Sequence, residues 1–361
     1  MLLVTFHGGS SGINNVYAYD TPDGTLATAA ALAQPSSGTL SELRAMVLAN
    51  DLLYVANGAK SSSTVLAYTL PSSGASSSGP LFTNPSTMIG PTLSKKGHFE
   101  TSIAHPFGIA FAGATTCYIS NQDTNVVGQV TVSGDGLSGS LGTGCQSAYL
   151  SKLFPDGTFL DGSYVASQVG SLHDVSVDAT PVPQGNGGLG VTLDNGKVKN
   201  SVRDVAIANG VLLVCDEPDN IISLYSLSDG SYLGSSNLLG SAPTHLAINN
   251  GGLYVSAGST LYWGQLPQSP QSASLALQQV ALTPPTGNKI GGISFDEGSP
   301  ARVYIPFQEG TGRAVGGSIF TYGVTQQSQS TLPVLLNGAA FVPAGTFADT
   351  PEFVLYWSSG S

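Results

Sequence analysis

A short strand-like segment recurs along the whole chain and limits the folds that it can adopt. Each copy is a run of leucine, β-branched or aromatic residues that stops at a Gly, Asn, Asp or Pro, as a β-strand followed by a turn does. The copies lie at residues 2–6, 52–57, 117–121, 212–216, 253–256, 303–306 and 353–356. Helix signals are nearly absent. The sequence therefore predicts an all-β fold with many strands.

Two further strand types accompany most copies of this segment. A strand rich in small residues precedes it, beginning near residues 44, 107, 203, 244, 291 and 337, and a third strand follows it, for example at residues 64–68, 221–225 and 318–322. A repeat of roughly 40 to 65 residues with three or four strands is typical of a β-propeller blade. We interpret the small-residue strand as the innermost one, because Gly and Ala let neighbouring blades converge.

The number of blades follows from counting these units. Five are clear, a sixth begins near residue 337 and is incomplete, and the stretch 150–202 supplies a degenerate seventh. The chain begins with the second strand type, so we expect the N- and C-terminal strands to pair and close the ring, which leaves no open sheet edge. The sequence predicts a single domain, residues 1–361, folded as a seven-bladed β-propeller, with six or eight blades as the alternatives.

The charge content excludes two classes of protein. Only 9% of the residues are charged, and 11 Lys and Arg stand against 22 Asp and Glu, for a net charge of −11. Nucleic-acid binding needs a basic surface, so we expect no nucleic-acid partner. No apolar run approaches the roughly 20 residues of a membrane span, so we expect no membrane partner. The low charge favours a secreted protein, although no signal peptide is visible, and we expect the protein to be a monomer.

Propeller geometry predicts where a binding site lies. The inner strands start, and the second strands end, on the same face, so residues there meet at one opening. The inner strands start at Arg44, Phe107, His173, Arg203, Thr244, Gly291 and Asn337, with His105 and His245 beside two of these positions. A chain with only four Arg places two of them at this opening. We interpret this ring of residues as a site for an anionic ligand. The alternative is that these Arg and His side chains have a structural role and hold loops by hydrogen bonds.

The ends of the second strands and one long insertion extend this opening. The second strands end at His7, Asn57, Asn121, Asp216 and Gln308, and the insertion carries Tyr149 and Tyr164 as one expected wall. The turns after Asn121 and Asp216 are rich in Asn and Asp, which are common turn formers, and their spacing does not match an EF-hand. We expect no metal and no other cofactor in the site, with calcium in the central channel as an open alternative.

Two sequence segments carry a resemblance to known families. Residues 106–110 (PFGIA) and 118–122 (YISNQ) resemble the lactonase-like, NHL and YncE-like propellers. With the propeller repeat, residues 104–108 (AHPFG) resemble propeller polysaccharide lyases of the fungal rhamnosyl-glucuronate type. This second resemblance implies a secreted lyase that cleaves a glycosidic bond to glucuronate by β-elimination, releases terminal rhamnose from a plant gum, and binds an anionic oligosaccharide or polysaccharide.

β-Elimination assigns roles to the residues of the opening. An Arg that pairs with the uronate carboxylate makes the neighbouring proton acidic enough for a base to remove. We expect His105 to be that base or a combined acid and base, Arg203 and Arg44 to neutralise the carboxylate, and His173 to be a second proton-handling or substrate-orienting group. The expected substrate-binding set is completed by His245, Asn121, Asp216, Tyr149 and Tyr164. Two other functions stay open, namely a lactonase-like hydrolase in which His activates water and a non-catalytic carbohydrate-binding propeller.

Overall fold

The expected all-β fold is confirmed. The computed structural model describes residues 1–7, 13–21, 23–58, 63–71, 79–90, 103, 105–122, 126–141, 192–194, 197–199, 202–217, 220–228, 230, 232–282, 288–308, 316–344, 346–347 and 349–358. Within these ranges the one helix is a short 3-10 turn, Pro270–Ser272. No helix in the described part of the chain is long and apolar enough to cross a membrane.

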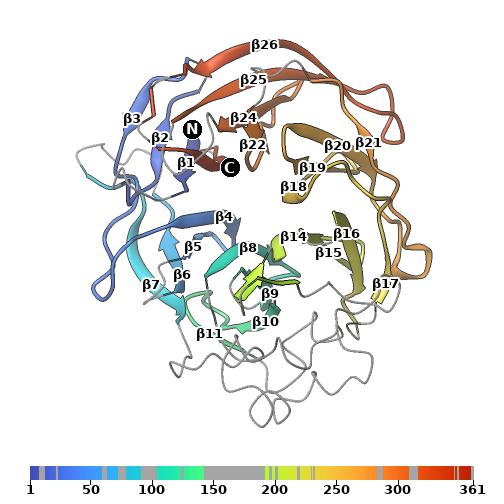
Figure 1. Cartoon of the computed structure of the whole chain (residues 1–361). Coiled ribbons are helices and arrows are strands. Elements are labelled where there is room, and N and C mark those ends of the chain that lie inside the picture. Colours follow the sequence, from blue (N-terminus) through green and yellow to red (C-terminus); the bar gives the residue numbers. More distant parts are fainter. Residues whose placement is uncertain are drawn as a thin grey trace.

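Six sheets surround a central axis as the blades of a β-propeller (Figure 1). From the inner to the outer strand, blade 1 holds β4 (Leu43–Ala49), β5 (Leu52–Asn57), β6 (Thr64–Thr69) and β7 (Thr83–Ile89). Blade 2 holds β8 (Pro106–Phe111), β9 (Thr116–Asn121), β10 (Val126–Val132) and β11 (Gly139–Leu141). Blade 3 holds β14 (Val202–Ala208), β15 (Val211–Asp216), β16 (Ile221–Ser226) and β17 (Tyr232–Ser235).

The other three blades follow in chain order. Blade 4 holds β18 (Pro243–Asn249), β19 (Gly252–Ala257), β20 (Thr260–Gln265) and β21 (Gln278–Gln279). Blade 5 has an interrupted inner strand, β22 (Lys289–Ile290) and β23 (Ser294–Phe295), followed by β24 (Arg302–Gln308), β25 (Gly317–Thr325) and β26 (Val334–Val342). Blade 6 joins β27 (Pro351–Tyr356) to β1 (Leu2–Phe6), β2 (Tyr17–Tyr19) and β3 (Leu26–Thr28).

The prediction of seven blades is wrong, because the described chain forms six. The inner strands β8 and β14 contact each other directly, which leaves no place for a blade between them. In the stretch expected to form that blade, the described residues make only a two-stranded sheet of β12 (Thr192–Asp194) and β13 (Lys197–Lys199). Residues 142–191, with the expected site residue His173, lie outside the described ranges.

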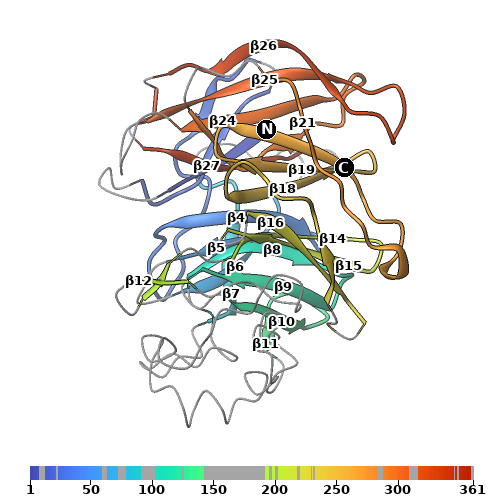
Figure 2. The same ribbon diagram turned by 45° about the vertical axis from the view of Figure 1, so that its right-hand side comes forward.

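The expected inner strand at Asn337 is also wrong. This segment belongs to β26, which pairs with β25 at the outer edge of blade 5 and is mostly exposed. Its small residues make room for an aromatic ring, since a Cβ on Gly338 would lie 2.3 Å from the ring of Tyr322. The inner strand of blade 6 is β27 instead, and it pairs with β1, so both ends of the chain lie in one blade (Figures 1 and 2).

The hydrophobic core lies between neighbouring blades and packs them against each other. Fully buried tyrosines occupy matching positions of the second strands, at Tyr54, Tyr118, Tyr254 and Tyr304. Clusters of buried side chains join blade 1 to blade 2, and blade 3 to blade 4, in the same way. These packed walls fix the starts of the inner strands around the central opening.

A β-bulge near the start of the inner strand sets the side chains of the opening. The register shifts after the first paired residue in β4, β8, β14, β18 and β27, so an extra residue stands on the inner strand. Such a bulge bends the strand and re-aims a side chain. The residues that follow the first paired residue are Arg44, Phe107, Arg203, Thr244 and Glu352, and they therefore occupy equivalent positions in five blades.

Candidate functional site

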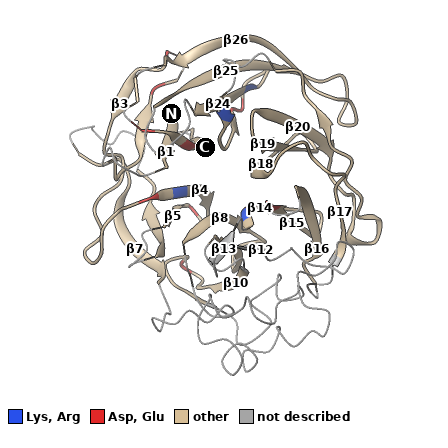
Figure 3. Cartoon of the chain, viewed as in Figure 1, with Lys and Arg blue, Asp and Glu red and all other residues tan. Residues whose placement is uncertain are grey.

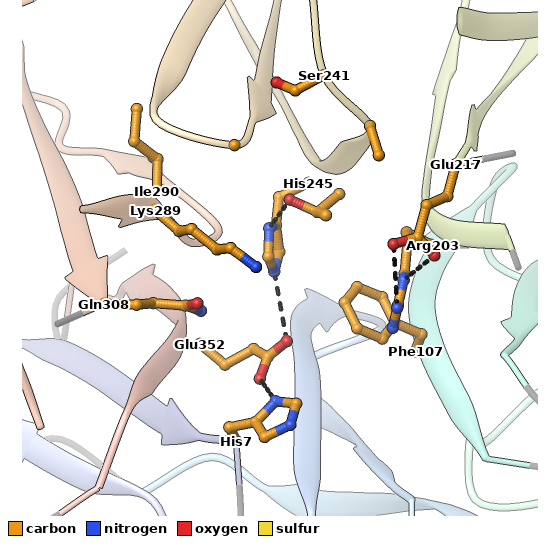
Figure 4. Close-up of a pocket in the computed structure, with 13 residues that line it drawn as sticks. His7, Phe107, Arg203, Glu217, Ser241, His245, Lys289, Ile290, Gln308 and Glu352 are labelled. Carbon is orange, nitrogen blue, oxygen red and sulfur yellow. Dashed lines mark hydrogen bonds and ion pairs between the residues drawn. The ribbon is translucent and has the colours of Figure 1, made fainter. Parts of the chain in front are cut away.

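A cavity of about 280 Å³ lies at this opening, and five blades contribute to its wall. Its charged and titratable lining residues are His7, Arg203, Glu217, His245, Lys289 and Glu352 (Figure 4). Charged residues are sparse over the blades, yet basic residues lie on the central strands β4 and β14 (Figure 3). Of the basic residues expected at the opening, His7, Arg203 and His245 line the cavity, together with Lys289 and the carboxylates of Glu217 and Glu352.

Glu352 is the buried centre of the site. Its Oε2 atom lies 2.5 Å from His7 Nδ1 and 3.2 Å from Arg44 Nη1, and only 6% of its side chain is exposed. Burial alone would raise the pKa of this carboxyl. The charge of Arg44, the hydrogen bond from His7 and the charge that His7 carries when it is protonated together outweigh burial and hold the pKa of Glu352 well below its usual range. Glu352 is therefore ionised at neutral pH.

His7 is oriented by that carboxylate. Because Glu352 Oε2 can only accept hydrogen bonds, His7 Nδ1 must carry the proton and donate it. The other ring nitrogen, Nε2, is then unprotonated in the neutral imidazole, and it forms no hydrogen bond within the described part of the chain. The His7 side chain is 44% exposed. A half-exposed imidazole with a buried carboxylate behind it is the arrangement of a general base.

His245 lies above Glu352 in the same cavity and is almost completely buried. Its ring packs edge-on against Phe353, with ring centroids 4.5 Å apart, and tilted against Phe107 at 5.4 Å. Its Nδ1 lies 2.9 Å from Thr244 Oγ1, and its Nε2 lies 3.9 Å from Glu352 Oε1. Burial lowers the pKa of His245 to about 4, so the ring is neutral at pH 7.

Three cations that line the pocket or lie behind its wall differ in how they are paired. Arg203 donates to both oxygens of Glu217, with Nε–Oε2 at 2.8 Å and Nη2–Oε1 at 3.2 Å. Arg44 is buried against Glu352. Lys289 extends into the pocket from β22 and forms no ion pair within the described residues (Figure 4). Lys289 is therefore the lining cation whose charge stays available to a ligand.

His105 and Arg44, the expected base and one expected carboxylate partner, lie together but do not line the cavity. His105 Nε2 is 3.3 Å from Arg44 Nη2 and 3.3 Å from Glu42 Oε2, and 8% of its side chain is exposed. The pocket has Phe107 in its wall, with Arg44 Cζ at 5.9 Å and Arg203 Cζ at 5.2 Å from the ring centroid. Of the two expected carboxylate partners, Arg203 reaches the pocket itself.

The remaining expected site residues fall into two groups. Asn121 and Asp216 are completely buried at the ends of β9 and β15, where Asn121 donates to the Ile119 carbonyl and Asp216 accepts from Ser223. They hold the strand ends and do not line the cavity. His173, Tyr149 and Tyr164 lie outside the described residues.

Three charged pocket residues were not predicted, namely Glu352, Glu217 and Lys289. A sequence signal for Glu352 exists, since Pro351 precedes it as Pro106 precedes Phe107 and Pro243 precedes Thr244. Each of these prolines is the first paired residue of its inner strand. The equivalence of Pro351 with these prolines was missed because the last inner strand was expected at residue 337. Within the described residues, no three His, Cys, Asp or Glu side chains are arranged to hold a metal ion.

The fold and its central opening define the chain as a β-propeller, and comparison with solved structures agrees. A protein from Lactobacillus plantarum is 12% identical, with a TM-score of 0.51 over 93% of this chain and 81% of that one. A chain of a nidogen/laminin complex is 12% identical, with a TM-score of 0.51 over 98% and 97%. A putative 6-phosphogluconolactonase from Bacteroides fragilis is 13% identical, with a TM-score of 0.49 over 94% and 81%.

At these identities the similarity shows the fold alone. No protein-family model matches the chain, and no curated protein matches it significantly in sequence. Function is therefore argued from the residues of the pocket.

Proposed function

We propose that this propeller is a hydrolase that opens small lactones or related esters, with His7 as the general base. One observation carries the proposal: His7, half-exposed in the wall of a 280 Å³ cavity, donates a 2.5 Å hydrogen bond from Nδ1 to the buried carboxylate of Glu352. A carboxylate behind an imidazole fixes its tautomer and stabilises the imidazolium that forms when it takes a proton.

The reaction follows from that tautomer. His7 Nε2 takes a proton from water while the water oxygen bonds to the substrate carbonyl carbon, and the carbonyl electron pair moves onto its oxygen. When this tetrahedral species collapses, the ring C–O bond breaks. The proton on His7 passes to the departing alkoxide, which leaves a hydroxy acid. Glu352 remains ionised throughout, paired with Arg44.

Lys289 fits the second requirement of this chemistry, a positive charge near the developing oxyanion. It is the lining cation without an ion-pair partner in the described residues, whereas Arg203 is already held by Glu217. A cation in a partly enclosed site stabilises a tetrahedral oxyanion far better than it would in water. The same charge favours substrates that carry an acidic group, as the sequence predicts. A cavity near 280 Å³ suits a single sugar-sized ring rather than a polymer chain.

The polysaccharide lyase predicted from the sequence places the base at His105. That residue is paired with Arg44 and Glu42 behind the pocket wall, which supports a hydrolase centred on His7 more than a lyase centred on His105. The two reactions release different products, so one experiment separates them. Hydrolysis of a lactone releases acid, and β-elimination at a uronate creates a double bond that absorbs in the ultraviolet.

The test incubates the protein with neutral and uronic sugar lactones and follows acid release at constant pH, above the spontaneous rate. The same protein is incubated with a rhamnosyl-glucuronate gum, and ultraviolet absorbance is followed. We expect acid release from at least one lactone, with loss of this activity in His7→Gln. Absorbance from the gum without lactone hydrolysis would overturn the proposal in favour of the lyase. Binding of these sugars with neither product would identify a non-catalytic binding propeller.

A further inference from the structure

His245 lines the pocket, and its hydrogen bonds show which of its two ring nitrogens carries the proton. Thr244 Oγ1 donates its single proton to the Ser256 carbonyl at 3.3 Å, so toward His245 it can only accept. His245 Nδ1 therefore carries the proton in the 2.9 Å contact with Thr244. Nε2 is left as an acceptor, and it is buried with no hydrogen-bond partner among the residues that the structure describes.

A second acceptor faces this nitrogen. Glu352 Oε1 lies 3.9 Å from His245 Nε2, while the hydrogen bonds from His7 and Arg44 both go to the other carboxylate oxygen, Oε2. Two acceptors cannot bond to each other. A buried polar atom without a partner costs free energy that a correctly placed donor recovers. The pair therefore presents two adjacent acceptors to whatever enters the pocket.

The protonation states keep both atoms acceptors near neutral pH. Burial lowers the pKa of His245 to about 4, with the charges of Arg203 and Arg44 acting in the same direction and that of Glu352 against it. The neighbouring cations hold the pKa of Glu352 low against the effect of burial. A ligand that satisfies both atoms must bring two hydrogen-bond donors of its own.

We propose that His245 Nε2 and Glu352 Oε1 form a subsite for two adjacent hydroxyl groups of the substrate, so that His245 is a specificity-determining residue. Two neighbouring hydroxyls offer one O–H to each acceptor. An ammonium group also offers several donors, but Lys289, which has no ion-pair partner in the described part of the chain, repels a cation from the same cavity (Figure 4). This inference rests on the proposed function, which it deepens by naming a polyhydroxylated lactone as the substrate class.

The kinetic test compares 2,3-dihydroxy-γ-butyrolactone with γ-butyrolactone, which differ only in the two hydroxyls. The wild type is expected to favour the diol at least tenfold in kcat/KM, because a site built to bond hydroxyls discriminates against a substrate that leaves its polar atoms unpaired. His245→Phe keeps a ring between the aromatic neighbours but has no acceptor, so the ratio should fall to near one. His245→Gln returns an acceptor oxygen and should restore part of the preference. Thermal unfolding of both variants shows whether they fold.

A binding test keeps this proposal separate from the proposed function. Saturation-transfer NMR compares cis-1,2-cyclopentanediol, cyclopentanol and cyclopentylamine on the wild type and on His245→Phe. We expect the diol to bind the wild type most strongly and to lose that advantage in the variant. Diol binding without hydrolysis of any lactone would overturn the hydrolase and keep the subsite. Hydrolysis without preference for the diol, or stronger binding of the amine, would overturn the subsite.

Discussion

Two histidine–glutamate pairs lie on either side of Arg44, and their exposures are reversed. In the first pair, the His7 side chain is 44% exposed and that of Glu352 is 6% exposed. In the second, the His105 side chain is 8% exposed and that of Glu42 is 31% exposed. Arg44 contacts both pairs through its two terminal nitrogens. The same two residue types thus form a histidine that faces the cavity and a histidine that lies behind it.

The backbone separates the two pairs as well. Glu42 and His105 both adopt left-handed conformations, with φ of 49° and 52°, whereas neither His7 nor Glu352 does. His105 is held tightly, since its backbone N–H donates to Ser63 and a Cβ on Gly58 would lie 2.7 Å from its ring. We infer that the second pair braces Arg44, and that Arg44 in turn holds the carboxylate of the first pair.

The largest expected effect comes from replacing the histidine of the first pair, with the histidine of the second pair replaced as the control. His7→Gln removes the proposed base and should lower kcat/KM for lactone hydrolysis on the order of 1,000-fold. His105→Gln is the matched control and should change it less than tenfold, because its ring does not line the cavity. Both are measured by acid release at pH 7. Equal losses in the two variants would remove the functional distinction between the pairs.

Loss of the carboxylate should also lower activity more in the first pair than in the second. Glu352→Gln loses the charge that fixes the His7 tautomer, and we expect a loss of roughly 500-fold in kcat. It also removes the nearer of the two carboxylates that face the buried Arg44 and leaves Glu42 at 3.8 Å, at a cost of about 3 kcal/mol in unfolding free energy. Glu42→Gln, at a partly exposed position, should change kcat less than threefold. A Glu352→Gln enzyme that keeps wild-type kcat would show that His7 needs no carboxylate behind it.

A third histidine, His245, contacts the first pair, and it should make the stability of the protein depend on pH. The pKa of His245 is about 4 in the folded protein, below the ordinary 6.5, because the ring is buried. Between these values the unfolded chain binds a proton that the folded chain does not, so stability falls as pH drops from about 6.5 to 4. Relative to His245→Phe, the wild type should lose up to about 3 kcal/mol over that range.

Denaturant unfolding of both proteins at pH 7 and pH 4 measures this difference. Asp204, whose pKa burial raises to about 7, changes stability in the opposite direction with pH, but it is present in both proteins and cancels. A constant difference between the wild type and His245→Phe would mean that His245 takes up a proton in the folded state as readily as in the unfolded one.

How much of this site the sequence could predict depends on the periodicity of each blade. The strand repeat placed Arg44, Phe107, Arg203 and Thr244 at equivalent positions, and the bulges of the inner strands do so in the structure. The strand repeat did not predict the position of Glu352. The small residues of β26 have the composition expected of an inner strand, but they accommodate the ring of Tyr322.

The partners of each residue were beyond prediction. Nothing in the sequence shows which of His7 and His105 faces the cavity, since both lie near the same opening and each pairs with a glutamate. Nor does the sequence show that Arg203 pairs with Glu217 rather than with its neighbour Asp204, whose carboxylate instead accepts the backbone N–H of Leu246 in the next blade. These choices depend on side-chain packing between blades, which strand periodicity does not encode.

The smallest expected effect tests the strained backbone of the second pair. At φ 49°, Glu42 occupies a region that costs a residue with a Cβ about 1–2 kcal/mol. Glu42→Ala removes the partly exposed carboxylate and keeps that cost, whereas Glu42→Gly removes both. Glu42→Gly should therefore be about 1 kcal/mol more stable than Glu42→Ala in denaturant unfolding, with similar lactone hydrolysis in both. A glycine variant that is less stable than the alanine variant would show that the backbone at Glu42 is not strained.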